Sequence, residues 1–199
     1  MELGPVLEPA HEVAGVFSVV MVCTGNICRS PGAERLLALE LSQRDLSDAL
    51  RIKISSAGVR GWDAAPMNEL SLAALEARGG SGEGFASRPI SESIVANASL
   101  ILTATKEHRS DVVEDYPKAL RKTFTMREFA VLVERDGAEY SSASELVAAA
   151  YRHRGGAEIL EWDIDDPYGR ESQQHEVAME TIHNCMSRIA DAIARCDTA

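Results

Sequence analysis

The chain has 199 residues, of which 45% are hydrophobic and 26% are charged, as is typical of a packed globular domain. Its formal net charge of −11 at pH 7 repels polyanions at long range, so we expect no nucleic acid and no anionic membrane as partner. Any recognition of phosphate must therefore be local.

The sequence indicates a cytoplasmic protein. Its first 15 residues contain no basic segment of the kind that begins a secretory signal, and the apolar run over residues 13–22 is too short to span a bilayer. Four cysteines are too few to indicate a disulfide framework: Cys23, Cys28, Cys185 and Cys196.

Strands and helices are predicted to alternate from residue 17 onward. The apolar run over residues 17–23 predicts a central strand that is covered on both faces. Ser30 as N-cap and Pro31 in the first turn predict a helix that continues to about residue 44. Residues 51–58 predict a second strand.

The second half of the chain continues this alternation. A helix with Pro66 inside its start and Gly79 beyond its end precedes a third strand over residues 99–105. Helices follow at about 106–115 and 125–135, and apolar spacing from Val177 to Ile193 predicts a long last helix.

This order predicts a doubly wound α/β fold, in which a mostly four-stranded parallel sheet carries helices on both faces in one three-layer domain. We expect an N-terminal extension over residues 1–16 and the domain over 17–199. A helical insertion at about 136–160, capped by Ser142 or Ser144 and closed by Gly155, could serve as a lid, an interface or padding.

The loop after the first strand reads CTGNICRS, residues 23–30. Gly25 and Asn26 tolerate positive φ, so the loop can curl until its backbone N–H groups point inward and bind a tetrahedral anion. Arg29 can hold two phosphoryl oxygens, and its charge together with the amide dipoles favours the thiolate form of Cys23. The Ser30 hydroxyl can donate to that sulfur. A cysteine at a strand end is more commonly a core residue, so the prediction of a nucleophile depends on this context.

A second motif, DIDDPYG, precedes the last helix. Transfer of a phosphoryl group to a thiolate releases an oxyanion that needs a proton, so a carboxylic acid must lie opposite the sulfur. Asp166, which Pro167 holds in an extended loop, is our candidate, and Asp163 and Asp165 are alternatives. Without the first motif, a solvated loop and helix cap would be the better interpretation.

With both motifs placed, the sequence resembles the low-molecular-weight protein tyrosine phosphatases, which carry V-C-x-G-N-I-C-R-S-P after the first strand and D-P-Y before the last helix. The resemblance implies that Cys23 forms a phosphocysteine intermediate, that Arg29 binds phosphate and that Asp166 is the general acid and then the base. It implies no metal and no cofactor. The implied partner is a phosphotyrosine-containing protein or a small aryl phosphate, and the residues implied to bind phosphate or a similar oxyanion are Thr24, Gly25, Asn26, Ile27, Cys28, Arg29 and Ser30.

The resemblance also assigns roles outside the loop. Ser56 matches a polar position that braces the loop, and Trp62 and Tyr168 match the aromatic walls of the cleft, although both rings could instead serve surface packing. Cys28 matches a second cysteine that can pair with Cys23 under oxidation. The chain departs from the family at Phe85, where many members have histidine, so we expect the loop to be braced differently.

Two other functions remain alternatives. An arsenate reductase on the same fold uses the same loop, but no cysteine lies between Cys28 and Cys185 to relay electrons, so it would need an external thiol partner. A noncatalytic phosphate-binding module would bind phosphotyrosine without turnover. We interpret His175 and His183 as solvent-facing residues and not as metal ligands.

Overall fold

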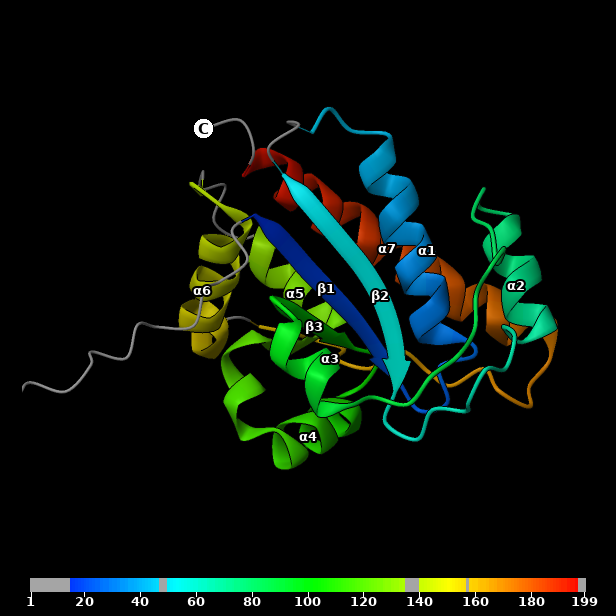
Figure 1. Ribbon diagram of the computed structural model, residues 1–199. Coiled ribbons are helices and arrows are strands. Elements are labelled where there is room, and N and C mark those ends of the chain that lie inside the picture. Colours follow the sequence, from blue (N-terminus) through cyan, green and yellow to red (C-terminus); the bar gives the residue numbers. More distant parts are fainter. Residues whose placement is uncertain (1–14, 47–49, 135–139, 157, 197–199) are drawn as a thin grey trace, which may run out of the picture.

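The computed structural model describes residues 15–46, 50–134, 140–156 and 158–196, so most of the predicted N-terminal extension lies outside the described residues. A four-stranded sheet forms its centre (Figure 1). The strands are β1 (Val16–Cys23), β2 (Arg51–Gly58), β3 (Leu100–Thr103) and β4 (Thr123–Thr125), in the order β2-β1-β3-β4. All neighbouring pairs are parallel, so the carboxyl ends of the strands share one edge. The predicted fold class is therefore confirmed.

Helices cover both faces of the sheet. They are α1 (Arg29–Ser42), α2 (Glu69–Glu76), α3 (Glu92–Asn97), α4 (Lys106–Asp115), α5 (Met126–Glu134), α6 (Ala143–His153) and α7 (Ser172–Arg195), with 3₁₀ turns at Pro117–Lys122 and Arg154–Gly156. Among the residues described, no helix is both long enough and apolar enough to cross a membrane.

The strand β1 separates two hydrophobic cores, because successive side chains of a strand point to opposite faces. Val19 and Met21 face the larger core, which α1, α5 and α7 complete. Val20 and Val22 face the smaller core, to which α3 and α4 contribute. Figure 1 shows α1 and α7 on one side of β1 and β2, and α3 and α4 on the other. The predicted burial of β1 on both faces is correct.

Two predicted helix starts are wrong in detail. The helix α1 begins at Arg29, with Cys28 at its N-cap and no side-chain cap, because the Ser30 hydroxyl contacts other groups of the loop. The helix α2 begins at Glu69 and not at Pro66, because the Asn68 side chain accepts hydrogen bonds from the N–H groups of Leu70 and Ser71.

Two short elements were not located from the sequence, α3 and the fourth strand β4, since six and three residues are too few to establish a periodic pattern. On α7 the predicted apolar stripe is buried except at its first member, Val177, which is 60% exposed.

The predicted insertion contains the helix α6, capped by Ser142, whose hydroxyl accepts from the N–H of Glu145 at 3.2 Å. The helix ends at His153, and Gly155 lies in the 3₁₀ turn that follows. In that turn Arg154 pairs with the fully buried Glu128 at 2.6 Å and lies over the ring of Phe124, which ties α6 to α5 and the edge strand β4. Figure 1 shows α6 away from the carboxyl ends of β1 and β2, a placement that does not suit a lid.

Candidate active site

A cavity of about 160 Å³ opens at the carboxyl end of β1. It brings together the first loop, the segment after β2 and the motif before α7. Its lining residues are Cys23, Thr24, Gly25, Ile27, Cys28, Arg29, Trp62, Asp166 and Tyr168. The structure thus gathers the predicted nucleophile, cation, acid and aromatic walls around one pocket, whereas Asn26, Ser30 and Ser56 are buried outside its lining.

The cysteine loop (residues 23–30) is held by its carbonyl groups. The segment after β2 donates its N–H groups to them: Val59 to Cys23 at 2.9 Å, Arg60 to Thr24 at 2.9 Å and Trp62 to Gly25 at 3.2 Å. In a trans peptide the N–H points away from the C=O of the same peptide unit. Because these carbonyls are held on the outer side of the loop, the N–H groups of the same units turn toward the pocket. This geometry fits the predicted anion-binding loop.

Asn26 gives the loop its bend. It is fully buried and adopts φ of +59°, in the left-handed region, whereas Gly25 does not adopt positive φ. Its Nδ2 donates to the hydroxyls of Ser30 at 2.9 Å and Ser56 at 2.8 Å, and its Oδ1 accepts from the N–H of Arg88 at 3.0 Å. Asparagine tolerates this conformation, and the three contacts hold it there.

The contacts behind the loop show how it is braced although position 85 is a phenylalanine. Ser56 Oγ donates to Glu34 at 2.5 Å, and Arg88 Nε donates to the Ser56 carbonyl at 2.9 Å. Phe85, at the position where the resembled phosphatases often have histidine, is half-buried against the larger core. The bracing therefore comes from Ser56, Glu34 and Arg88, of which the sequence pointed only to Ser56.

Cys23 lies at the end of β1, 2% exposed. Its Sγ is 3.0 Å from Ser30 Oγ, which also accepts from Asn26. The hydroxyl has one proton, which it can donate to the sulfur or to the Ala57 carbonyl at 3.4 Å, and the sulfur lies closer. A thiolate is the sulfur form that accepts such a bond best.

Arg29 joins the cysteine loop to the loop before α7. Nη1 donates to the Ile164 carbonyl at 3.0 Å, and Nη2 pairs with Asp166 Oδ2 at 2.6 Å. Nε is buried and has no hydrogen-bond partner among the described residues. A buried charged donor without a partner is costly, so an oxyanion in the pocket would satisfy it.

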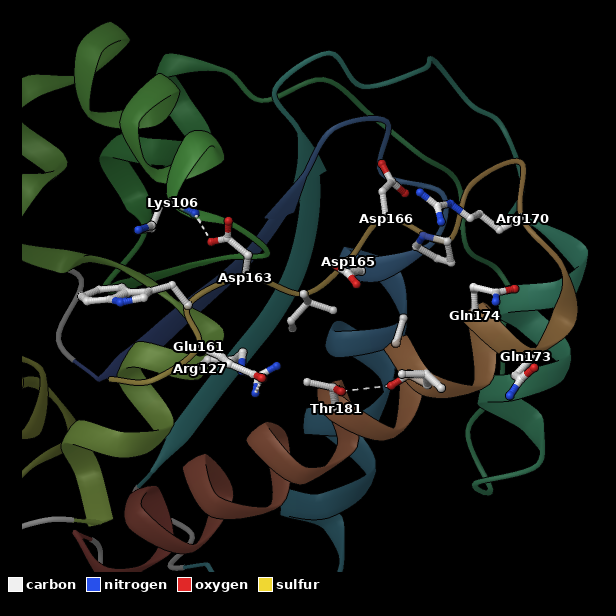
Figure 2. A pocket seen from close by; sticks show the side chains of 15 residues that line it. Lys106, Arg127, Glu161, Asp163, Asp165, Asp166, Arg170, Gln173, Gln174 and Thr181 are labelled. Atoms are coloured by element: carbon white, nitrogen blue, oxygen red, sulfur yellow. Dashed lines mark hydrogen bonds and ion pairs between the residues drawn. The ribbon is translucent and has the colours of Figure 1, made fainter. Parts of the chain in front are cut away.

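The three candidate acids of residues 163–168, the acid loop, point in different directions (Figure 2). Asp163 accepts from the backbone N–H of Lys106 at 2.8 Å, and Asp165 faces a separate cavity beside α7. Only Asp166 lines the pocket of Cys23, and its Oδ1 accepts from the N–H of Tyr168 at 3.1 Å. The geometry therefore favours Asp166 over its two neighbours.

The walls of the pocket mouth are aromatic and apolar. Trp62 and Tyr168 are about half exposed, and their rings meet edge to face with centroids 6.1 Å apart. Ile27 is buried in the cysteine loop and also lines the pocket. These side chains present apolar surface to any group attached to a phosphate in the loop.

Cys28 also lines the pocket but is a different kind of thiol. Burial raises its pKa to about 11, which the hydrogen bond from Ser71 only partly offsets. At neutral pH Cys28 is therefore protonated.

The sequence reasoning missed His108, which is buried on α4. Its ring nitrogens lie 2.8 Å from Thr24 Oγ1 and 2.8 Å from Thr105 Oγ1, so it braces the side of the loop that faces Arg29. Burial first, and then the charge of Arg29, lower its pKa to about 4, so the ring is neutral at pH 7. Its position just after β3, beside the carboxyl end of β1, is the signal that could have identified it.

The expectation for the two α7 histidines is wrong for His175, which is 1% exposed and hydrogen-bonded to Ser71. His183 is partly buried and contacts Glu40 Oε1 at 2.6 Å. Within the described part of the chain, no group of three or more His, Cys, Asp or Glu side chains is placed to hold a metal ion.

Comparison with known proteins decides the family. The model of the family described as low molecular weight phosphotyrosine protein phosphatase matches residues 18–140. The chain belongs to this family. The identification from the two motifs is therefore confirmed.

Its relatives in this family differ in substrate. The chain is 37% identical to the low molecular weight protein-tyrosine-phosphatase Etp of Escherichia coli K12 over 53% of this chain and 66% of that protein, just under two thirds of its length. It is 31% identical to a protein-arginine-phosphatase of Bacillus subtilis over 57% of this chain and 72% of the relative. A protein-tyrosine phosphatase A of Mycobacterium tuberculosis H37Rv matches at 28% identity over 87% of this chain and 89% of that one.

Solved structures share the fold. The tyrosine phosphatase Wzb of Escherichia coli K30 in complex with sulphate has a TM-score of 0.66 at 22% identity, covering 87% of this chain and 96% of its own. The arginine phosphatase YwlE of Geobacillus stearothermophilus has a TM-score of 0.65 at 24% identity, covering 88% and 91%.

Gly58 tests the shape of the cysteine loop. A Cβ at this position would lie 2.4 Å from the Thr24 carbonyl, whereas a Cβ at Gly155 would meet nothing within 4 Å. We expect Gly58→Ala to displace the loop and weaken binding of orthovanadate by about 10-fold or more, because misplacement of a binding group by 1 Å is costly. The inhibition constant measures the effect. We expect Gly155→Ala, the control, to leave the inhibition constant unchanged. An unchanged inhibition constant in Gly58→Ala would contradict the prediction.

Proposed function

We propose that the chain is a protein tyrosine phosphatase that hydrolyses aryl phosphate monoesters through a phosphocysteine intermediate. The observation that carries the proposal is the shared pocket of Cys23, Arg29 and Asp166, with a buried Nε of Arg29 left to bind an oxyanion. The phosphate lies in the cysteine loop and accepts hydrogen bonds from its backbone amides and from Arg29.

In the first step the Cys23 thiolate attacks phosphorus. The P–S bond forms, the P–O bond to the aryl group breaks, and Asp166 donates its proton to the departing phenolic oxygen. In the second step Asp166 takes a proton from water, the water oxygen attacks phosphorus, and the sulfur leaves as a thiolate that the Ser30 hydroxyl stabilises at 3.0 Å. Phosphate is released, and Asp166 ends the cycle protonated.

The ion pair between Arg29 and Asp166 suits these two reaction steps. A phosphate dianion in the loop competes with Asp166 for the guanidinium and places negative charge beside the carboxylate. The oxyanion therefore frees the Asp166 carboxyl group from Arg29 to face the leaving oxygen.

The pocket walls favour phosphotyrosine as substrate. Trp62, Tyr168 and Ile27 offer apolar surface to an aromatic ring. Because one relative is named a protein-arginine-phosphatase, phosphoarginine is the second candidate. No nucleic acid or membrane partner is proposed, in keeping with the acidic chain.

The deciding experiment is turnover of a phosphotyrosine peptide and of the matched phosphoarginine peptide by the purified protein, without added metal. We expect phosphate release from phosphotyrosine to be faster and to be inhibited by orthovanadate. Faster release from phosphoarginine would overturn the choice of substrate. Thiol-coupled arsenate reduction without aryl phosphate hydrolysis would favour the reductase, and tight binding without phosphocysteine after rapid quench would favour a noncatalytic module.

Replacement of the nucleophile separates binding from turnover. We expect Cys23→Ser to abolish hydrolysis of aryl phosphates while phosphate affinity is retained, because the loop amides and Arg29 remain. Calorimetric titration with phosphate measures the affinity. Cys185→Ala, at a buried cysteine of α7 outside the pocket, is the matched control and should keep its turnover. Residual turnover in Cys23→Ser near the level of the control would contradict the covalent mechanism.

Replacement of the acid has a smaller and more selective effect. We expect Asp166→Ala to lower the rate by roughly 10²–10⁴ on aryl phosphates whose leaving group needs a proton, the range typical of general acid catalysis. Steady-state kinetics with Asp165→Ala provide the control. If Asp165→Ala were the damaging change, the assignment of the acid would be wrong.

A further inference from the structure

His175 is a buried polar residue that the proposed mechanism does not use. It lies on the first turn of α7, nine positions after Asp166, and is 1% exposed. A buried imidazole needs partners for its ring nitrogens, and those partners reveal which parts of the fold it joins.

One side of the ring faces α2. His175 Nδ1 lies 2.8 Å from Ser71 Oγ, and Ser71 is itself 1% exposed. The Ser71 hydroxyl also hydrogen-bonds the Cys28 thiol and lowers its pKa. The ring is therefore connected through a single hydroxyl to the cysteine loop.

His175 Nε2 is buried and has no hydrogen-bond partner among the described residues. Burial lowers the pKa of His175, and the charge of Asp166 and the backbone of Pro167 offset this lowering only in part. His175 is thus neutral at pH 7.

From these contacts we propose that His175 is a positioning residue that fixes the acid loop relative to the cysteine loop. Its hydrogen bond to Ser71 ties the first turn of α7 to α2, and only residues 169–171 separate α7 from the acid loop. Asp166 reaches the leaving oxygen only if the acid loop is held in place, so loss of the ring shifts the acid and not the nucleophile. The inference deepens the proposed function and rests on it.

The test compares two substrates that depend differently on the acid. Phenyl phosphate releases a strongly basic phenolate that needs a proton, whereas 4-nitrophenyl phosphate releases a weakly basic one. We expect His175→Phe to lower kcat/KM for phenyl phosphate about 10-fold more than for 4-nitrophenyl phosphate, the scale of effect that a displaced catalytic group has. Inhibition by orthovanadate, which reports on the cysteine loop, should change less than twofold.

Three further variants separate positioning from simple stability. His175→Asn places an amide near the site of Nδ1 and should recover part of the loss. Ser71→Ala removes the hydrogen-bond partner of His175 while keeping the ring, and we expect the same selective loss from it. This variant tests the proposal even if His175→Phe does not fold. His183→Gln, two turns further along α7 and in contact with Glu40, is the matched control and should leave the ratio of the two substrates unchanged.

Equal losses on both substrates, or no loss, would overturn the role of His175. Failure of the wild-type protein to hydrolyse either substrate would instead overturn the proposed function. The two failures are therefore distinguishable.

Discussion

The candidate site depends on one buried side chain, that of Asn26. Its left-handed backbone turns the cysteine loop, and its amide contacts three otherwise separate parts of the chain: Ser30 on α1, Ser56 on β2 and Arg88 before α3. A loop held from behind in this way keeps its amide dipoles directed into the pocket before any ligand arrives. Such preorganisation is the main source of electrostatic stabilisation in enzyme sites.

Arg29 connects this rigid loop to the rest of the pocket. Nη1 holds the backbone of the acid loop at Ile164, while Nη2 contacts the Asp166 carboxylate. The acid loop is also attached to the end of β3, because the N–H of Ile164 donates to the Ala104 carbonyl at 2.9 Å. An oxyanion that displaces the contact with Asp166 would therefore leave the loop's backbone attachments in place.

The features that could be predicted from the sequence are those whose signal is contiguous. The loop from Cys23 to Ser30 and the pair Asp166-Pro167 carry their chemistry in adjacent residues, and β1 and α7 are long enough to show a pattern. The roles of Glu34, Arg88 and His108 arise from contacts between segments 22 to 84 positions apart, and a single sequence does not record such distances. His175 was misjudged for the same reason, since its partner Ser71 is 104 residues away.

The pairing of β1 has a consequence for how this family can vary. The apolar residues of β1 from Phe17 to Val22 each face one of two cores, and Cys23 lies opposite Gly58 at the end of the ladder. A slip of one residue would exchange the contents of the two cores and rotate the thiol to the wrong side of the sheet. Insertions are therefore far easier to accommodate beyond the edge strand β4, where α6 lies, than within the strand that ends at the nucleophile.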